Sequence, residues 1–131
     1  MGQPAAKQGD TITAVDIHII MIPAAAGAPV PTPLPHPFNG IINGGLSPNV
    51  NVMGMPAATQ GGTATNTPPH IPQGGPFQKP PSNSATIIMG SSRVMINGKP
   101  VARAGDTALT CNDPADLPNG TVVATSSVLV G

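Results

Sequence analysis

One ten-residue segment occurs twice in this chain and a third time in degraded form. The segment PAAKQGDTIT at residues 4–13 recurs as PAATQGGTAT at residues 56–65, with seven of ten positions identical. The segment PVARAGDT at residues 100–107 is the third copy. Repetition with a period of about 50 residues is typical of folds built from similar units, because one such unit cannot bury its apolar face alone. The sequence therefore predicts three related units.

Each copy is followed by a side chain that can bind a metal. His18 and His70 each lie 14 residues after the first proline of their copy, and Cys111 lies 11 residues after that of the third. With His36 they are the only histidines and cysteine of the chain. Three imidazoles and one thiolate form a tetrahedral set that suits Zn²⁺. We predict one structural zinc site made of His18, His36, His70 and Cys111; the alternative is ordinary strand and loop histidines with backbone partners.

The length and composition limit which class of protein this can be. A length of 131 residues predicts a single domain, residues 1–131. Proline and glycine are abundant, with 18 and 16 residues, but only 8% of residues are charged and 39% are hydrophobic. Disordered chains combine high charge with low hydrophobicity, so this chain is expected to fold. Two phenylalanines and no tryptophan or tyrosine leave an aliphatic core that a bound metal would stabilise.

Charge and cysteine content narrow the partners and the compartment. The net charge is zero and there is no basic run, which disfavours nucleic acid and anionic membrane surfaces and favours association with protein. A single cysteine excludes an internal disulfide. The apolar residues 17–30 follow Asp10 and Asp16 instead of a basic region, and Pro23 and Pro29 interrupt them. We expect synthesis in the cytoplasm without a signal peptide.

Short strand signals dominate, and helical periodicity is absent, so the expected fold is all-β. The β-branched or aliphatic segments are residues 11–21, 40–43, 49–53, 86–90, 93–96, 121–124 and 127–130. We predict hairpins at 40–53, 86–96 and 121–130. The first two run directly into a repeat copy, whereas after the third the chain ends and the amino terminus supplies the next copy. This order predicts a ring of three β units with adjacent termini.

Proline-rich connectors separate the units, at residues 29–37, 68–81 and 114–118. His36 and His70 lie within the first two, each next to proline. The fixed φ of proline stiffens the backbone and lowers the entropy lost when a ligand is held in place. We predict rigid loops that converge on a metal-bound apex.

The residues argue against catalysis. A shell of four protein ligands leaves no open position for water or substrate. The chain has no glutamate, and Asp10 and Asp106 lie in Gly-Asp-Thr turns, where a carboxylate commonly accepts local N–H bonds. We expect that this protein is not an enzyme. Two other classes stay open: a small zinc-dependent hydrolase, which needs an open coordination position, and a proline-rich adaptor without metal.

The repeated Pro-Ala-Ala element, followed by histidine and finally by cysteine, resembles the PAAR-repeat family of contractile injection systems. The strongest local matches are residues 4–10, 30–37 and 97–106. The resemblance implies a short β cone of three pseudo-threefold units, with one zinc ion near its point held by three histidines and one cysteine. The sequence departs from the family pattern at Lys7 and Thr59, which replace the arginine that the third copy keeps as Arg103.

The resemblance also implies a function. Such a protein caps and sharpens the homotrimeric spike of a type VI secretion system or of an extracellular phage-tail-like particle, with one tip per trimer. It can tether effector cargo, and it contacts and pierces the target membrane. It leaves the bacterial cell as part of the particle. The absence of an attached toxin domain favours a tip over an effector. We expect the three predicted hairpins to contact the spike, and polar substitutions at Val52, Val94 or Val128 to weaken docking.

Overall fold

The computed structural model describes residues 2–131 and is all-β, as predicted. Among these residues there is no helix, and so none that is long and apolar enough to cross a membrane. The strands are β1 (Gln3–Pro4), β2 (Thr11–Ile22), β3 (Val30–Gly44), β4 (Asn51–Val52), β5 (Met55–Pro56), β6 (Thr63–Asn66), β7 (Ser84–Ile87), β8 (Met95–Ile96), β9 (Lys99–Pro100), β10 (Thr107–Thr110), β11 (Leu117–Val123) and β12 (Leu129–Val130).

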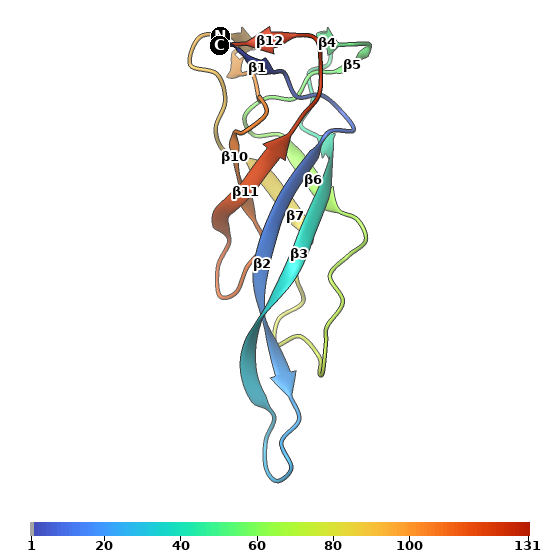
Figure 1. Cartoon of the computed structure of the whole chain (residues 1–131), viewed down its shortest axis with the longest axis vertical. Coiled ribbons are helices and arrows are strands. Elements are labelled where there is room, and N and C mark those ends of the chain that lie inside the picture. Colours follow the sequence, from blue (N-terminus) through green and yellow to red (C-terminus); the bar gives the residue numbers. More distant parts are fainter. Residues whose placement is uncertain (1) are drawn as a thin grey trace.

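Six strands close into a barrel in the order β10-β11-β2-β3-β6-β7 (Figure 1). Every neighbouring pair whose register is resolved runs antiparallel, and the longest ladder joins β2 to β3 from Thr11↔Ile41 to Ile22↔Val30. Closure pairs both edges of each barrel strand near the middle of the barrel, which removes the exposed edges that would otherwise favour aggregation. Beyond β6, the β2–β3 ladder continues as a ribbon and forms the narrow end.

The repeats meet at the centre of the barrel. The strands β2, β6 and β10 each begin seven residues after the first proline of a copy. The amide of Ala6 donates to the carbonyl of Ala102 at 2.9 Å, that of Ala102 to Ala58 at 3.0 Å, and that of Ala58 to Ala6 at 3.0 Å. All three alanines are fully buried. The three copies are therefore joined in a closed ring of backbone hydrogen bonds.

Three two-stranded ribbons form the wide end: β4–β5, β8–β9 and β1–β12 (Figure 1). Asn97 and Gly98 join β8 to β9 with φ of 54° and 77°, and Met53 and Gly54 join β4 to β5 with φ of 51° and 81°. Two successive residues at positive φ are what a type I′ hairpin turn requires. The third ribbon has no turn, because it pairs the two ends of the chain, and the predicted adjacency of the termini is confirmed.

The predicted hairpins at 40–53, 86–96 and 121–130 are wrong. Each segment begins in a barrel strand and ends in a ribbon strand, and that ribbon strand pairs with the repeat copy that follows. Apolar alternation marks strands but not their partners. Val52 is buried at 4% exposure beside Ala57 and Val101, so a polar residue there would disrupt packing rather than a surface. Val94 and Val128 are exposed.

The first predicted connector, residues 29–37, is also not a loop, because β3 spans most of it. Its prolines alternate at positions 31, 33, 35 and 37, opposite Met21, Ile19, Ile17 and Val15 of β2. The pairing with β6 starts only at Gly40, so this stretch of β3 has a free outer edge. Proline is tolerated at such an edge, where its missing N–H removes no ladder bond.

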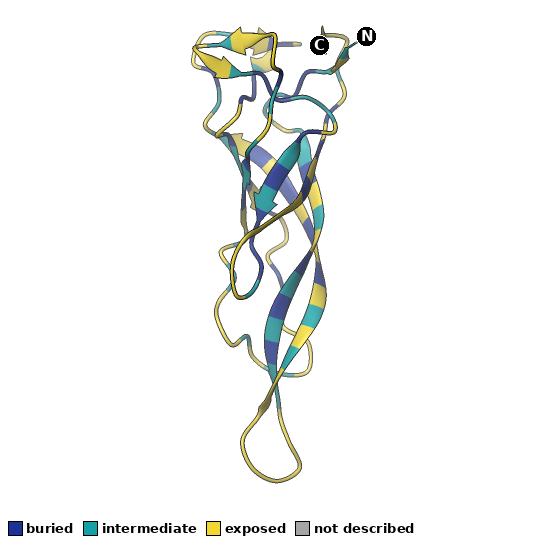
Figure 2. Ribbon diagram, turned by 90° about the vertical axis from the view of Figure 1, so that its left-hand side faces the viewer, coloured by how far each residue is buried: buried dark blue, intermediate teal, exposed yellow. Residues whose placement is uncertain are grey.

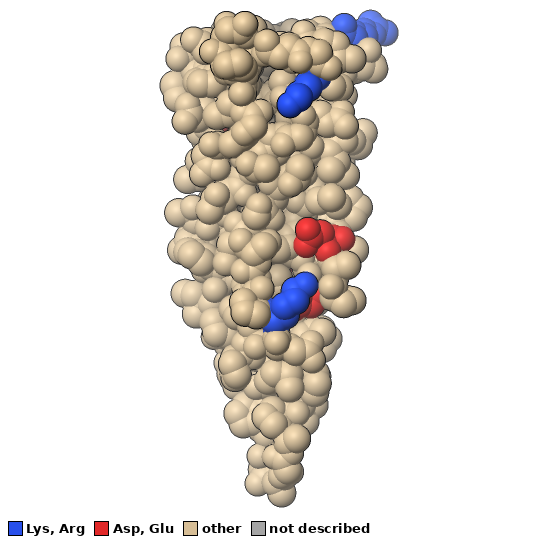
Figure 3. Space-filling model, turned by 180° about the vertical axis from the view of Figure 1, so that it is seen from behind, with Lys and Arg blue, Asp and Glu red and all other residues tan. Residues whose placement is uncertain are grey.

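The core is small and aliphatic. Phe38, Ile12, Ile42, Ile87 and Val122 are at most 2% exposed, and each such side chain stabilises the fold by about 1.5–3 kcal/mol. Alanines of the three copies fill the space between them. Figure 2 shows the resulting alternation of buried and exposed residues along the strands. The molecule tapers toward the β2–β3 ribbon, and the face seen in Figure 3 carries no charged side chain at its narrow end.

Candidate metal centre

All four predicted ligands are buried in the narrower half of the barrel. His18 lies on β2, His36 on β3, His70 in the segment between β6 and β7, and Cys111 directly after β10. Their exposed fractions are 1%, 3%, 9% and 3%. The imidazole centroids are 5.5 Å apart for His18 and His36, 4.9 Å for His18 and His70, and 5.5 Å for His36 and His70. The fold therefore gathers the three rings from separate strands and a loop.

Strand periodicity explains which side chains of β2 enter this cluster. Asp16, His18 and Ile20 alternate along the strand and all are at most 1% exposed, so they share its inward face. In the β2–β3 ladder Asp16 stands opposite His36. A carboxylate and two imidazoles thus reach the interior from one pair of strands.

His18 has one ring nitrogen held and the other free to bind an ion. Nδ1 lies 3.4 Å from Oδ2 of Asp113, which also accepts the amide of Ile19 at 2.9 Å. Nε2 lies 3.7 Å from Sγ of Cys111. A nitrogen and a sulfur bound to one tetrahedral zinc are about 3.5 Å apart. Burial lowers the pKa of His18, against the opposite effect of Asp113, and so favours the neutral imidazole that binds metals.

His36 offers an orphaned nitrogen. Its Nδ1 donates to the carbonyl of Leu34 at 2.9 Å, which leaves Nε2 as a bare acceptor. That Nε2 is buried and has no hydrogen-bond partner among the described residues. Buried polar atoms are nearly always satisfied, and a metal-binding histidine normally donates its other nitrogen to a carbonyl or carboxylate. The donor set of this site therefore fits a metal ion.

His70 is positioned by its backbone and by a carboxylate. Its amide donates to Oδ1 of Asn83 at 2.8 Å, and Asn83 also accepts from the side chain of Asn66 at 3.1 Å. Its Nε2 lies 2.8 Å from Oδ2 of Asp16. The anchors at Asn83 and Asp16 hold the imidazole in place although His70 belongs to no strand.

Cys111 is a buried thiol beside an acid. Its Sγ lies 3.4 Å from Oδ2 of Asp16. Burial, together with the negative charge of Asp16, raises the pKa of Cys111 to about 11. At neutral pH the sulfur of the metal-free protein therefore keeps its proton. Metals bind the thiolate, so a bound cation must displace this proton.

The structure brings three of the predicted ligands into one group and adds a residue that the sequence analysis missed. The ligand atoms of Asp16, His18, His70 and Cys111 lie within 4.8 Å of one another, and such a group could hold a metal ion. His36 lies next to this group, with its ring near those of His18 and His70. Asp16 could have been found from its position two residues before His18, on the same face of a predicted strand.

The surroundings of the cluster are mixed. A small cleft of about 80 Å³ beside His18 and Cys111 is lined in part by Asp113 and Asp116. The ring of Phe77 lies 5.8 Å from His18 and 5.6 Å from His36, centroid to centroid. A cleft of about 300 Å³ adjoins His36 and His70. Its remaining walls are proline, asparagine, threonine, isoleucine and glutamine, so no carboxylate faces the cleft as a general base.

The sequence model of the PAAR motif family matches residues 34–113 and again residues 77–131, which together cover well over half of the chain. The matched region includes His36, His70, Cys111 and the second and third repeat copies. No curated protein matches the chain.

Proposed function

Because the chain belongs to the PAAR motif family, we propose that it is the structural tip of a contractile injection system, seated on the spike of that machine. The family match is the observation that carries this proposal. The site geometry supports a structural role, since buried side chains from separate strands and loops converge on one point.

We infer that the molecule is a cone of three pseudo-threefold units. The ring formed by Ala6, Ala58 and Ala102 supports this, and so does the presence of one ribbon per unit at the wide end. A single chain with three similar surfaces can match a homotrimer, because closed symmetry allows one contact pattern to be used three times. The expected stoichiometry is one tip per spike trimer.

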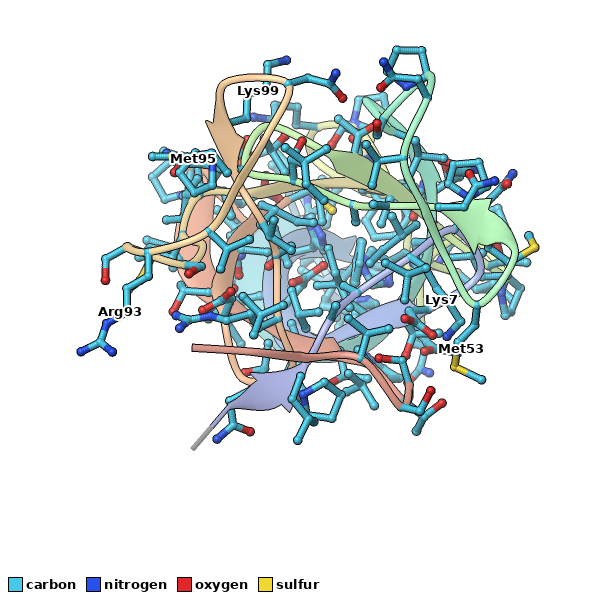
Figure 4. All side chains as sticks on the ribbon, turned by 90° about the horizontal axis from the view of Figure 1, so that it is seen from above. Lys7, Met53, Arg93, Met95 and Lys99 are labelled. Carbon is cyan, nitrogen blue, oxygen red and sulfur yellow. The ribbon has the colours of Figure 1, made fainter. Side chains whose placement is uncertain are left out.

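The wide end is the surface proposed to meet the spike. Its ribbons and their flanks expose large apolar side chains: Met53, Met55, Val94, Met95, Val128 and Leu129. Figure 4 views the molecule from this end and shows Met53, Arg93, Met95 and Lys99 around the rim. Large apolar side chains exposed at one end of a molecule are typical of interaction sites. The ribbon backbones could also continue the β-structure of the spike.

The proposed metal is one zinc ion held by His18, His36, His70 and Cys111. Bound there, zinc supplies a cross-link and no reaction. It would tie β2, β3, the end of β10 and the segment between β6 and β7 together. Because the unfolded chain has no preformed site, the free energy of metal binding adds directly to folding stability.

The narrow end is proposed to make the transient contact with the target membrane. Residues 17–35 contain no lysine, arginine, aspartate or glutamate. The β2–β3 ribbon that they form ends in the loop at residues 23–29 (Figure 1). A narrow, uncharged point suits penetration of a bilayer. Delivery outside the cell, and tethering of effector cargo, would follow from a place at the front of the particle.

Stoichiometry tests the proposal. The chain is mixed with the purified trimeric spike protein of a contractile injection system from the same cell, and the complex is weighed by native mass spectrometry. We expect one copy of this chain per three spike chains. A complex with three copies, or no complex at micromolar concentration, would overturn the proposed role.

A further inference from the structure

Asp16 is a buried carboxylate whose only basic partner among residues 2–131 is an imidazole. It is fully buried, and neither lysine nor arginine lies within ion-pair distance of it among the described residues. Its neighbours are the thiol of Cys111, Nε2 of His70 and the hydroxyl of Thr110, whose Oγ1 lies 2.5 Å from Oδ1. A buried carboxylate is costly when no fixed positive charge lies beside it, and the imidazole of His70 is a cation only when protonated. A cation bound at the cluster would supply the compensating charge.

The charges around the cluster decide whether a monovalent or a divalent cation would balance them. A bound ion would face two negative groups, the carboxylate of Asp16 and the thiolate of Cys111, which lie 3.4 Å apart, and three neutral imidazoles. The other nearby carboxylate, Asp113, has Lys79 at 3.9 Å from its Oδ1. Two negative charges are balanced by a divalent cation, whereas a monovalent cation leaves one buried charge uncompensated.

Without Asp16, the remaining ligands would not favour a divalent ion over a monovalent one. Thiolate and imidazole are soft or borderline ligands, and such a set accepts Cu⁺ as well as Zn²⁺. With Cys111 as the only anion, a monovalent ion would give a neutral site and a divalent ion a site of charge +1. With the carboxylate of Asp16 added, a divalent ion gives the neutral site and a monovalent ion leaves a net charge of about −1. A carboxylate is also a hard oxygen ligand, whereas Cu⁺ prefers soft ligands.

We propose that Asp16 is the charge-balancing member of the metal centre and makes it select a divalent ion over Cu⁺. This inference rests on the proposed metal centre. The side chain of Asp16 is well placed for the role, because Thr110 and His70 hold its two oxygens and fix the charge beside the sulfur.

The test compares two ions in matched variants. Asp16→Asn removes the charge and keeps the shape and one oxygen acceptor. Affinities are measured by competition with a zinc chelator and, under reducing anaerobic conditions, with a Cu⁺ chelator. We expect Asp16→Asn to bind Zn²⁺ about 10–100-fold more weakly, the usual effect of losing a group that supports a metal site. Cu⁺ affinity should be unchanged or higher.

Asp116→Asn is the control, because it makes the same substitution at an exposed carboxylate outside the ligand group. Its ratio of Zn²⁺ to Cu⁺ affinity should stay near that of the wild type. Asp16→Ser is measured in parallel, so that a folded variant without the charge is available if Asp16→Asn does not fold. Equal losses for both ions, or unchanged Zn²⁺ affinity, would overturn the role of Asp16. A wild-type chain that binds neither ion would instead overturn the metal centre itself.

Discussion

The amide of Ala58 donates a 3.0 Å hydrogen bond to the carbonyl of Ala6, and Ala102 completes the ring. Residues from three distant parts of the chain therefore depend on one another's backbone position. All three are 0% exposed, which leaves no space for a larger side chain at the centre of the barrel. The repeated alanine of the sequence is thus explained by packing around the ring.

Enlarging this alanine should destabilise the whole molecule. Overpacking a filled core costs about 1–3 kcal/mol, so we expect Ala58→Val to lower the free energy of unfolding by that amount. The measurement is urea unfolding of metal-loaded protein. Ala25→Val, in the exposed loop at residues 23–29, is the control and should unfold like the wild type. Equal stability of Ala58→Val would show that the centre is loosely packed.

A carboxylate closes the turn of the third copy. Oδ2 of Asp106 accepts the amide of Arg103 at 2.7 Å, and Oδ1 accepts from its guanidinium at 2.9 Å. The hydrogen bond to Asp106 raises the pKa of Arg103. Lys7 and Asp10 repeat the arrangement in the first copy, whereas the middle copy has Gly62 in place of the acid.

Removing that carboxylate should leave the partly buried amide of Arg103 without its acceptor. Hydrogen bonds to charged groups contribute about 1.5–3 kcal/mol, so Asp106→Ala should lower the free energy of unfolding by roughly this amount. Thermal unfolding at constant metal concentration measures the change. Asp116→Ala, at an exposed position in the segment between β10 and β11, is the control and should have little effect.

Metal removal should destabilise the chain. Structural zinc contributes on the order of 10 kcal/mol in small zinc-finger peptides, so a strong chelator or Cys111→Ala should lower the melting temperature sharply. Elemental analysis of protein purified without added metal should give one zinc per chain. A folded, metal-free chain, or a Cys111→Ala variant that melts like the wild type, would contradict the site.

Metal affinity should increase with pH. The pKa of Cys111 is raised to about 11, so between pH 6 and 8 the sulfur carries a proton in the metal-free protein and a bound cation must displace it. One released proton makes the apparent binding constant rise about tenfold per pH unit. Burial lowers the pKa of His18, which favours the neutral imidazole and so reduces its contribution to this slope.

Competition titrations at several pH values measure this slope. Cys111→Ala should bind more weakly and should lose about one unit of the slope of log K against pH. A slope that is the same with and without Cys111 would show that the thiol does not bind the ion.

Part of the fold and of the site was predictable from local sequence. Asn97 and Gly98 specify their own turn, β2 has an unbroken apolar pattern, and the repeat frame indicates His18, His70 and Cys111. The proline-rich part of β3 was not predictable, because whether proline is tolerated depends on which edge lacks a partner. Short strands such as Thr63–Asn66 have too few apolar residues to stand out, and their pairing is set by barrel closure. The shared strand face of Asp16 and His18 was predictable, but the role of Asp16 was not, because only tertiary structure brings His70 and Cys111 near it.

Docking to the spike should depend on the ribbons of the wide end. Met95 on β8 and Leu129 on β12 are 57% and 62% exposed, so a charge at either position should leave the core intact. Desolvating that charge in an apolar interface is costly, and we expect Met95→Asp and Leu129→Asp each to weaken spike binding at least tenfold. Val15→Asp is the matched control, because Val15 is 58% exposed but lies on the side of the barrel. Binding is measured with the spike trimer immobilised on a sensor surface and each variant of this chain in solution. Equal weakening by all three substitutions, or by none, would show that the wide end is not the docking surface.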